Sequence, residues 1–352
     1  MAEKNLVRLQ TQLRHLINPD RKSLPTSDEA FLHWLGGPTL LSFPGRDRSR
    51  SRMVVTLLHG NEPSGTRGIL RYLSSEQEPA TDLHVLIVSV TTALTQPLFS
   101  HRQLPGERDM NRCFSPPYDG ELGHLAGEIL RLIERLSPEA VVDIHNTSGN
   151  GPAFSVCTVL TRAHVALTAF FTHRIVVTDL RMGTLIEHNT EARPFITIEC
   201  GGADGEEADR LSFAGLGRFL TSPDLYAQSP DQEIDLYHHP VRLELKPGAS
   251  IAYSDDSNLA DVVMPVDIDR KNFGVVTPDM PLAWINNPDA VTLHTAQGHG
   301  PVDDFFVVRN QRLFPSHPLK LFMVTTNPRI AASDCLLYAV KEMDHRHLLA
   351  LI

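Results

Sequence analysis

Short, predominantly apolar segments constrain the fold of this chain more than any other feature. They cover residues 53–58 (MVVTLL), 83–90 (LHVLIVSV) and 140–144 (AVVDI), and residues 196–198 (ITI) form the centre of a fourth. Each segment is too short for a helix of typical length and is apolar on both faces of a strand. Such strands are typical of a sheet that is covered by other elements on both sides.

Helical segments alternate with these strands. Residues 64–74 have the apolar spacing and small residues of a helix packed on a sheet, and residues 122–136 (LGHLAGEILRLIERL) have an amphipathic helical pattern. Residues 40–43 add a further strand, and residues 1–16 have the pattern of an amphipathic helix. The order of elements predicts an α/β fold with a mixed, largely parallel sheet flanked by helices.

The amino-acid composition changes after about residue 221. Residues 222–232 (SPDLYAQSPDQ) are rich in Ser, Pro and Asp, which is typical of a linker. We therefore expect two domains, 1–225 and 226–352. The second contains short apolar runs separated by Pro, Gly and Asn, which predict a smaller β-rich domain; these runs are residues 241–245, 260–265, 305–308 and 319–324.

Composition excludes several classes of function. The formal net charge of −10 argues against a nucleic-acid groove, which requires clustered basic residues. No apolar stretch approaches the roughly 20 residues needed to span a membrane, and the N-terminal segment lacks the apolar core of an export signal. Four scattered cysteines favour reduced thiols in a cytoplasmic protein: Cys113, Cys157, Cys200 and Cys335. The oligomeric state, including a homo-oligomer, stays open.

Three potential metal ligands follow two of the apolar strands. His59 and Glu62 come directly after residues 53–58, and His145 comes directly after residues 140–144. Open α/β sheets bind their ligands at the carboxyl ends of strands, so these side chains are expected to meet. Two imidazoles and a carboxylate suit Zn²⁺ and leave a coordination position open for water. The sequence predicts one catalytic zinc ion per chain.

Four short motifs occur in a suggestive order: HGNEPSG (59–65), RDMNRCF (108–114), DIHNTSG (143–149) and TIECGG (197–202). Together they resemble the aspartoacylase and succinylglutamate desuccinylase family, a branch of the zinc carboxypeptidase superfamily, over roughly residues 50 to 205. The resemblance implies a zinc carboxypeptidase-like fold in which His59, Glu62 and His145 are the zinc ligands. It also implies that the second domain overhangs the active site.

The same resemblance makes Glu199 the catalytic carboxylate. A carboxylate beside an activated water can accept its proton as general base and deliver a proton to the leaving amine as general acid. By the family pattern, Asn111 and Arg112 hold a substrate carboxylate, because a guanidinium matches a carboxylate through two parallel hydrogen bonds. The expected partner is therefore a small molecule that bears a carboxylate.

Two arginines compete for the role of stabilising the oxyanion. Arg108 lies in the motif itself and is the first candidate, but the family's arginine usually stands further upstream, so Arg102 competes with it. Asn146 and Thr147 follow the third ligand and are candidates for shaping the substrate pocket, although turn formation explains them equally well. Asn189 stands where aspartoacylase has a further substrate-binding arginine, so the resemblance leaves the substrate open.

These patterns predict a zinc-dependent amidohydrolase that cleaves the amide bond of a small N-acyl amino acid or a related carboxylate-bearing amide. Two alternatives remain: a zinc carboxypeptidase acting on peptides, and a non-catalytic protein that binds a metal or metabolite.

Overall fold

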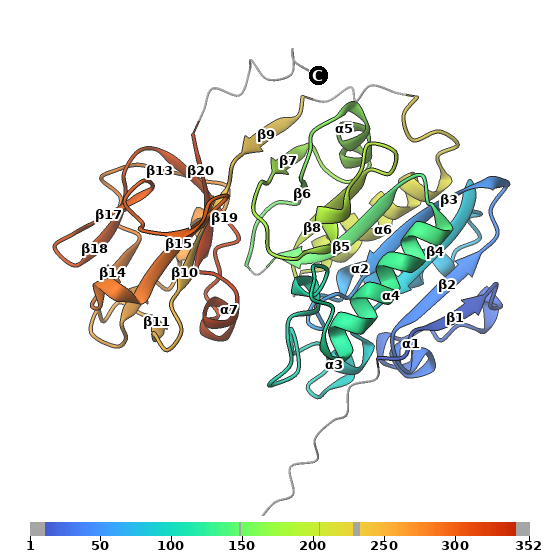
Figure 1. The fold of residues 1–352 in the computed structure, drawn as a ribbon, viewed down its shortest axis with the longest axis horizontal. Helices are drawn as coiled ribbons and strands as arrows, with labels where there is room; N and C mark the ends of the chain where they lie inside the picture. The colour runs from blue at the N-terminus through green and yellow to red at the C-terminus, as the bar shows by residue number, and fades with distance from the viewer. Residues whose placement is uncertain (1–10, 148, 204, 228–232, 343–352) are drawn as a thin grey trace, which may run out of the picture. The chain divides into compact units, whose positions relative to one another are not determined.

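The computed structural model describes residues 11–147, 149–203, 205–227 and 233–342 (Figure 1). The chain divides into two compact units, each considered by itself. Unit 1 comprises Met1–Asn146, Phe154–His173 and Met182–Glu233, and unit 2 comprises Thr147–Ala153, Arg174–Arg181 and Ile234–Ile352. The units are thus interleaved along the sequence, and the domain boundary near residue 225 stays a prediction.

The sheet of unit 1 has the strand order β1-β2-β4-β3-β5-β8-β6. Strands β1 and β2, β3 and β4, and β3 and β5 pair in parallel, whereas β2 and β4, and β6 and β8, pair antiparallel. The strands are β1 (Arg14–Ile17), β2 (Thr39–Phe43), β3 (Asp47–Thr56), β4 (Thr81–Ile87), β5 (Val141–Thr147), β6 (Phe154–Cys157) and β8 (Phe195–Gly202). The prediction of a mixed, largely parallel α/β sheet is confirmed.

Helices connect these strands in unit 1. They are η1 (Arg21–Ser23), α1 (Asp28–Leu35), α2 (Ser64–Leu73), α3 (Val90–Leu94), η2 (Met110–Arg112), α4 (Gly120–Leu136), α5 (Arg162–Ala169), η3 (Leu185–His188) and α6 (Glu206–Thr221). The segment predicted as a strand over residues 83–90 therefore ends at Ile87, and its last residue begins α3. Helices α2 and α4 match the two helices that the sequence predicts.

The surroundings of β3 explain why this strand is apolar on both faces. Met53 and Val55 belong to a buried cluster with residues of α4, such as Leu125 and Ile129. Because side chains alternate along a strand, Thr56 points to the opposite face, where Gly65 of α2 approaches it. Helices thus cover both faces of this strand.

The sequence predicts a helix over residues 1–16, but the last residues of this segment form a strand. Residues 1–10 lie outside the described part of the chain, and Arg14–Ile17 form β1. Backbone hydrogen bonds join Arg14 N to Pro38 O at 2.9 Å and Asn18 N to Ser42 O at 2.7 Å. The backbone of β2 therefore offers a parallel pairing site, and this pairing outweighs the local helical pattern.

Unit 2 is built from short strands. A parallel pair is formed by β7 (Arg174–Val177) and β9 (Asp235–His238). Its described residues also form a six-stranded sheet in the order β13-β19-β20-β10-β15-β16 and a five-stranded sheet in the order β11-β12-β14-β18-β17. The strands are β10 (Val241–Leu245), β11 (Ile251–Tyr253), β12 (Val262–Met264), β13 (Val275–Val276), β14 (Ala283–Ile285), β15 (Val291–Thr295), β16 (Gly298–Gly300), β17 (Phe306–Arg309), β18 (Arg312–Pro315), β19 (Leu319–Phe322) and β20 (Leu337–Lys341).

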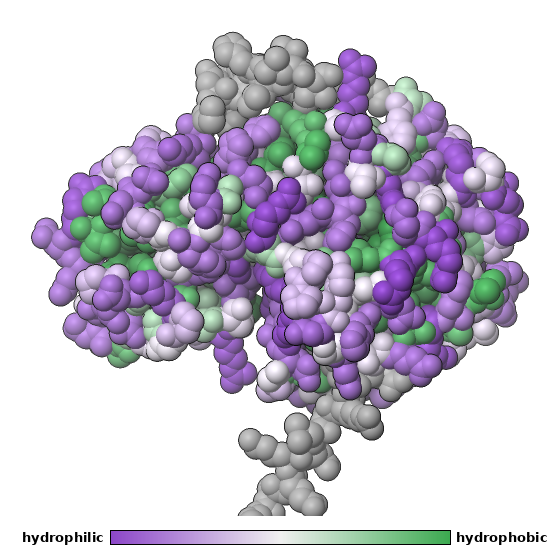
Figure 2. Space-filling model, viewed as in Figure 1, coloured by the Kyte–Doolittle hydropathy of each residue, from purple (hydrophilic) through white to green (hydrophobic). Residues whose placement is uncertain are grey.

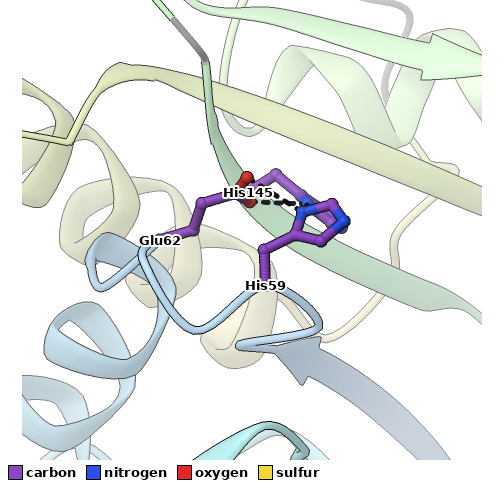
Figure 3. Close-up of side chains that lie close together, drawn as sticks. All are labelled: His59, Glu62 and His145. Atoms are coloured by element: carbon purple, nitrogen blue, oxygen red, sulfur yellow. Dashed lines mark hydrogen bonds and ion pairs between the residues drawn. The ribbon is translucent and has the colours of Figure 1, made fainter. Parts of the chain in front are cut away.

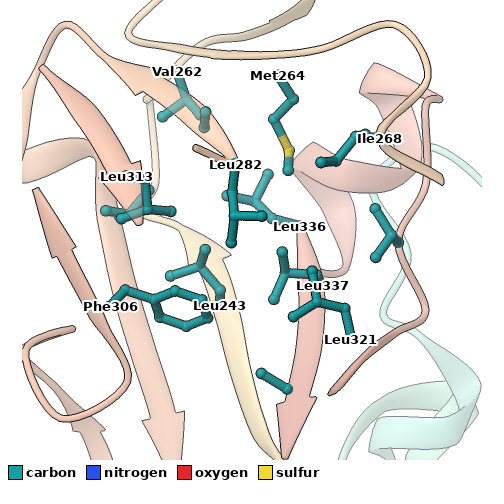
Figure 4. Close-up of a cluster of buried hydrophobic side chains, with 14 of the residues drawn as sticks. Leu243, Val262, Met264, Ile268, Leu282, Phe306, Leu313, Leu321, Leu336 and Leu337 are labelled. Atoms are coloured by element: carbon teal, nitrogen blue, oxygen red, sulfur yellow. The ribbon is translucent and has the colours of Figure 1, made fainter. Parts of the chain in front are cut away.

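Side chains from both sheets of unit 2 meet in one apolar core, which includes Leu243 of β10, Val262 of β12, Leu313 of β18 and Leu337 of β20 (Figure 4). The remaining helical elements are η4 (Ile268–Lys271), η5 (Pro288–Ala290) and α7 (Pro328–Ser333). The prediction of a β-rich C-terminal region is confirmed.

The surface seen in Figure 2 is mainly hydrophilic, with apolar residues in small patches. This agrees with the large set of apolar side chains that are buried in the two units. Among the described residues, no helix is long and apolar enough to cross a membrane.

Gly65 is required by the close approach of α2 to the sheet. A Cβ atom at this position would lie 2.2 Å from Thr56 Oγ1 and 2.9 Å from Ile144 Cβ. We expect Gly65→Ala to lower the free energy of unfolding by about 1–3 kcal/mol, the usual cost of overpacking a core. Denaturant unfolding of both proteins measures this difference.

Gly217→Ala in α6 is the matched control, since its Cβ would only reach ordinary contact at 3.5 Å. This substitution should leave stability unchanged or increase it, because alanine favours helices by about 1 kcal/mol over glycine. Equal effects of the two substitutions would contradict the packing explanation.

Candidate active site

The loop that leaves β3 carries the first two candidate ligands. Leu57 has a φ of 59°, a left-handed conformation that turns the chain as the strand ends. Gly60 N donates to Arg102 O at 3.0 Å, and a Cβ at Gly60 would lie 2.6 Å from Thr92 Cγ2. The loop is therefore packed closely against the segment that contains Arg102 before α2 begins at Ser64.

The side chains of His59, Glu62 and His145 converge at the end of this loop (Figure 3). Glu62 Oε1 lies 2.8 Å from His59 Nδ1, and Glu62 Oε2 lies 2.7 Å from His145 Nδ1. The two Nδ1 atoms are 3.2 Å apart. All three residues are at most 5 % exposed. Residues 86 positions apart thus present their donor atoms to one small space.

Each histidine also contacts a carboxylate through its other ring nitrogen. Asp109 Oδ1 lies 3.0 Å from His59 Nε2, and Asp143 Oδ2 lies 2.8 Å from His145 Nε2. Each carboxylate can accept a hydrogen bond from Nε2–H. The lone pair of Nδ1 then faces the shared space. Partners of this kind fix the tautomer and orientation of histidines that bind metals.

The electrostatics of the cluster favour a cation. Burial opposes charge on His145, but the carboxylates of Asp143 and Glu62 outweigh it and raise the pKa of this imidazole well above its usual value. Burial likewise opposes ionisation of Glu62, yet the charges of His59 and His145 lower the pKa of its carboxyl. Negative charge is therefore concentrated around the converging Nδ1 atoms.

The donor set fits one metal ion. One ligand atom from each of His59, Glu62 and His145 lies within 4.8 Å of the others. Two imidazoles and one carboxylate are a ligand set that catalytic sites use while leaving a position for water. The cluster can therefore bind one metal ion.

Glu199 lies in β8, opposite Phe154 of β6, and is 8 % exposed. Its Oε2 atom is buried and has no hydrogen-bond partner. Burial raises the pKa of the Glu199 carboxyl to about 8, and the charge of His145 opposes this shift. A carboxyl group with a pKa near neutrality and an unpaired oxygen is suited to proton transfer.

The two candidate arginines have different surroundings. Arg102 donates to Asp109 Oδ2 at 3.0 Å and lies 3.4 Å from Glu62 Oε1, and its side chain is 11 % exposed. Arg108 instead pairs with Asp119 at 2.9 Å, and its side chain is 50 % exposed. Of the two, Arg102 is the arginine in contact with the His59–Glu62–His145 cluster, although Arg108 lies in the motif.

Asn111 and Arg112 are adjacent to this cluster through Asp109. Asn111 N donates to Asp109 Oδ1 at 2.8 Å, and the Asn111 side-chain oxygen accepts from Leu185 N at 3.0 Å. Arg112 Nη1 donates to Asn111 O at 2.8 Å and lies 4.0 Å from Asp109 Oδ2. Asn111 is buried, whereas the Arg112 side chain is 24 % exposed. Asn111 therefore anchors the loop, and Arg112 is the more accessible of the pair.

Asn146 joins three elements of unit 1. Its Oδ1 accepts from Ser64 N at 3.0 Å, and its Nδ2 donates to Ser64 Oγ at 2.9 Å and to Gly201 O at 3.0 Å. These bonds use both amide donors of a residue that is 2 % exposed. Thr147 Oγ1 donates to Gly149 O at 2.6 Å, which is a local turn contact. Both side chains make hydrogen bonds within the fold, and their role in shaping the substrate pocket stays a prediction.

Asp143 is a site residue that sequence reasoning missed. It lies two residues before His145 in β5, so both side chains point to the same face of the strand. An acidic residue inside an otherwise apolar buried strand is costly unless it is paired. Its position two residues before a candidate ligand was therefore a usable signal.

We expect Asp143→Asn to weaken metal binding about 10–100-fold, the usual effect of removing such a partner. The fold should persist, since asparagine has nearly the same shape. Competition between the protein and a chelator measures the affinity, and Asp119→Asn, an exposed carboxylate paired with Arg108, is the control. Equal affinity in the wild-type protein and Asp143→Asn would contradict a supporting role for Asp143.

Solved structures share this fold at low sequence identity. Succinylglutamate desuccinylase from Chromobacterium violaceum is 15 % identical, with 87 % of this chain and 89 % of that chain covered at a TM-score of 0.54. Murine aminoacylase 3 is 14 % identical, with 85 % and 97 % covered at a TM-score of 0.54. The chain has the desuccinylase/aspartoacylase fold.

A product-bound ectoine utilization protein from Ruegeria pomeroyi is similar as well, at 13 % identity, 86 % and 88 % coverage and a TM-score of 0.53. No protein-family model and no curated protein match the sequence. The similarity in fold to these solved structures agrees with the resemblance of the four sequence motifs.

Proposed function

We propose that this protein is a zinc-dependent hydrolase that cleaves the amide bond of a small N-acyl amino acid or a related carboxylate-bearing amide. The observation that supports it most is the buried His59–Glu62–His145 cluster together with Glu199, a carboxyl with an unpaired oxygen that interacts electrostatically with this cluster. A purely structural cluster would not need an unpaired buried carboxyl, because such a group costs folding free energy.

When bound, zinc supplies an acidified water and polarises the carbonyl of the amide. Glu199 accepts a proton from the attacking water and then delivers a proton to the nitrogen of the leaving amine. Its raised pKa suits both steps, because the group must hold and release a proton near neutral pH. Water attacks directly, so no covalent intermediate with the protein forms.

Arg102 is proposed to stabilise the negative charge that develops on the carbonyl oxygen. Its guanidinium is held by Asp109 and lies beside the ligand Glu62. A cation that is fixed before the reaction needs no reorganisation when the charge appears. Arg112 is proposed to bind the substrate carboxylate, since it combines partial exposure with a position next to the cluster.

A hydrolysis screen tests this function. Protein loaded with zinc is incubated with N-acetyl, N-formyl and N-succinyl amino acids and with short peptides, and release of free amine is measured. We expect hydrolysis of at least one N-acyl amino acid. Cleavage of peptides alone would support the carboxypeptidase alternative, and inactivity toward every substrate would support a non-catalytic binding protein.

A further inference from the structure

A second group of potential ligands lies on three neighbouring strands of unit 2. Arg242 of β10 stands opposite His294 of β15, and His294 stands opposite His299 of β16. Glu244 lies two residues beyond Arg242 and therefore on the same face of the sheet. Leu243, between them, points into the apolar core (Figure 4). Glu244, His294 and His299 thus share the face opposite this core.

The three side chains are in contact. Glu244 Oε2 lies 3.0 Å from His299 Nε2, and Glu244 Oε1 lies 3.5 Å from His294 Nδ1. The two imidazole rings stack with centroids 4.3 Å apart. His294 Nδ1 is buried, and its contact with Glu244 Oε1, at 3.5 Å, is longer than a well-formed hydrogen bond. A buried ring nitrogen whose partner is this distant requires an explanation, and a ligand is one.

The surrounding charges permit a cation there. Arg242 forms ion pairs with both Glu244 and Asp334. One guanidinium therefore faces two carboxylates, and the group retains net negative charge. Glu244 also keeps acceptor capacity, because a carboxylate offers about four lone-pair positions.

We propose that Glu244, His294 and His299 form a divalent-metal site in unit 2. One ligand atom from each lies within 4.8 Å of the others. Imidazole and carboxylate ligands suit zinc and similar transition metals rather than calcium or magnesium. Because β16 is the last strand of its sheet, an ion held here would tie this edge strand to β10 across β15.

Zinc binding to the full-length chain tests the proposal without any measurement of activity. In His59→Ala/His145→Ala, which lacks two ligands of the first cluster, we expect one zinc ion per chain after equilibrium dialysis. Adding His299→Ala should reduce this number to zero. His299 is an exposed edge residue, with 56 % of its side chain accessible, so its replacement leaves the core intact.

His239→Asn is the matched control. His239 is an exposed histidine of unit 2 that pairs with one carboxylate, Asp179, at 2.8 Å. Its φ is 55°, and asparagine tolerates this left-handed conformation. Zinc binding in the His59→Ala/His145→Ala background should be unchanged by this substitution.

The unmodified chain provides an independent measurement if the double variant does not fold. It should bind two zinc ions, and His299→Ala should bind one. Cobalt(II) added to the second site should give visible absorption that His294→Gln abolishes. A second ion that persists in His299→Ala, or an unmodified chain that binds one ion only, would overturn the proposal. Glu244, His294 and His299 would then be a cluster that interacts without a metal.

Discussion

Replacing Glu199 with glutamine is expected to lower kcat for amide hydrolysis by about 10²–10⁴-fold, the contribution typical of a general acid–base group. Glutamine has the size of glutamate but cannot take a proton from water. Two observations support this role: Glu199 is buried, and its Oε2 atom has no hydrogen-bond partner among the described residues. Steady-state hydrolysis of the best substrate from the screen measures the effect.

Metal content is the control for this variant. Glu199 is not among the three proposed ligands, so Glu199→Gln should retain the same number of metal ions as the wild-type protein. A loss of both metal and activity would indicate a ligand role for Glu199. Unchanged turnover with full metal content would move the general base to another residue.

Replacing Arg102 with alanine is expected to lower kcat by about 10²–10³-fold, the loss seen when one donor to an oxyanion is removed. The Arg102 side chain is largely buried and contacts both Asp109 and Glu62. Because Glu62 is a proposed ligand, metal affinity must be measured beside turnover. The kinetic loss should persist at zinc concentrations that saturate the variant.

Arg108→Ala is the matched control, since both arginines were candidates from the sequence. Arg108 is half exposed and pairs with Asp119, so its loss should change kcat less than about threefold, as expected for a surface ion pair of small energetic weight. A larger loss in Arg108→Ala than in Arg102→Ala would reverse the assignment.

The strand cores and the cluster of His59, Glu62 and His145 were the parts that the sequence predicted best. Runs such as residues 53–58 are apolar because helices cover both faces of the sheet. This requirement for apolar residues can be recognised in the local sequence. His59 and Glu62 follow from the position at which such a run stops. His145 falls inside β5 rather than after it, because backbone pairing extends the strand to Thr147.

The choice between Arg102 and Arg108 could not be made from the sequence. It depends on a loop whose path is set by contacts between distant residues, including Gly60 N with Arg102 O and His59 with Asp109. No periodicity encodes such contacts. Strand β1 was missed for a related reason, since its pairing with β2 overrides a local helical pattern.

Metal reconstitution tests the central claim most directly. Wild-type protein stripped with a chelator and resupplied with zinc should regain hydrolysis of an N-acyl amino acid once one ion occupies the site formed by His59, Glu62 and His145, because three protein ligands form that site. His145→Ala, treated in the same way, should remain inactive at the same zinc concentration. Full hydrolysis by the stripped protein, or equal zinc-dependent recovery in His145→Ala, would contradict a catalytic metal held by His59, Glu62 and His145.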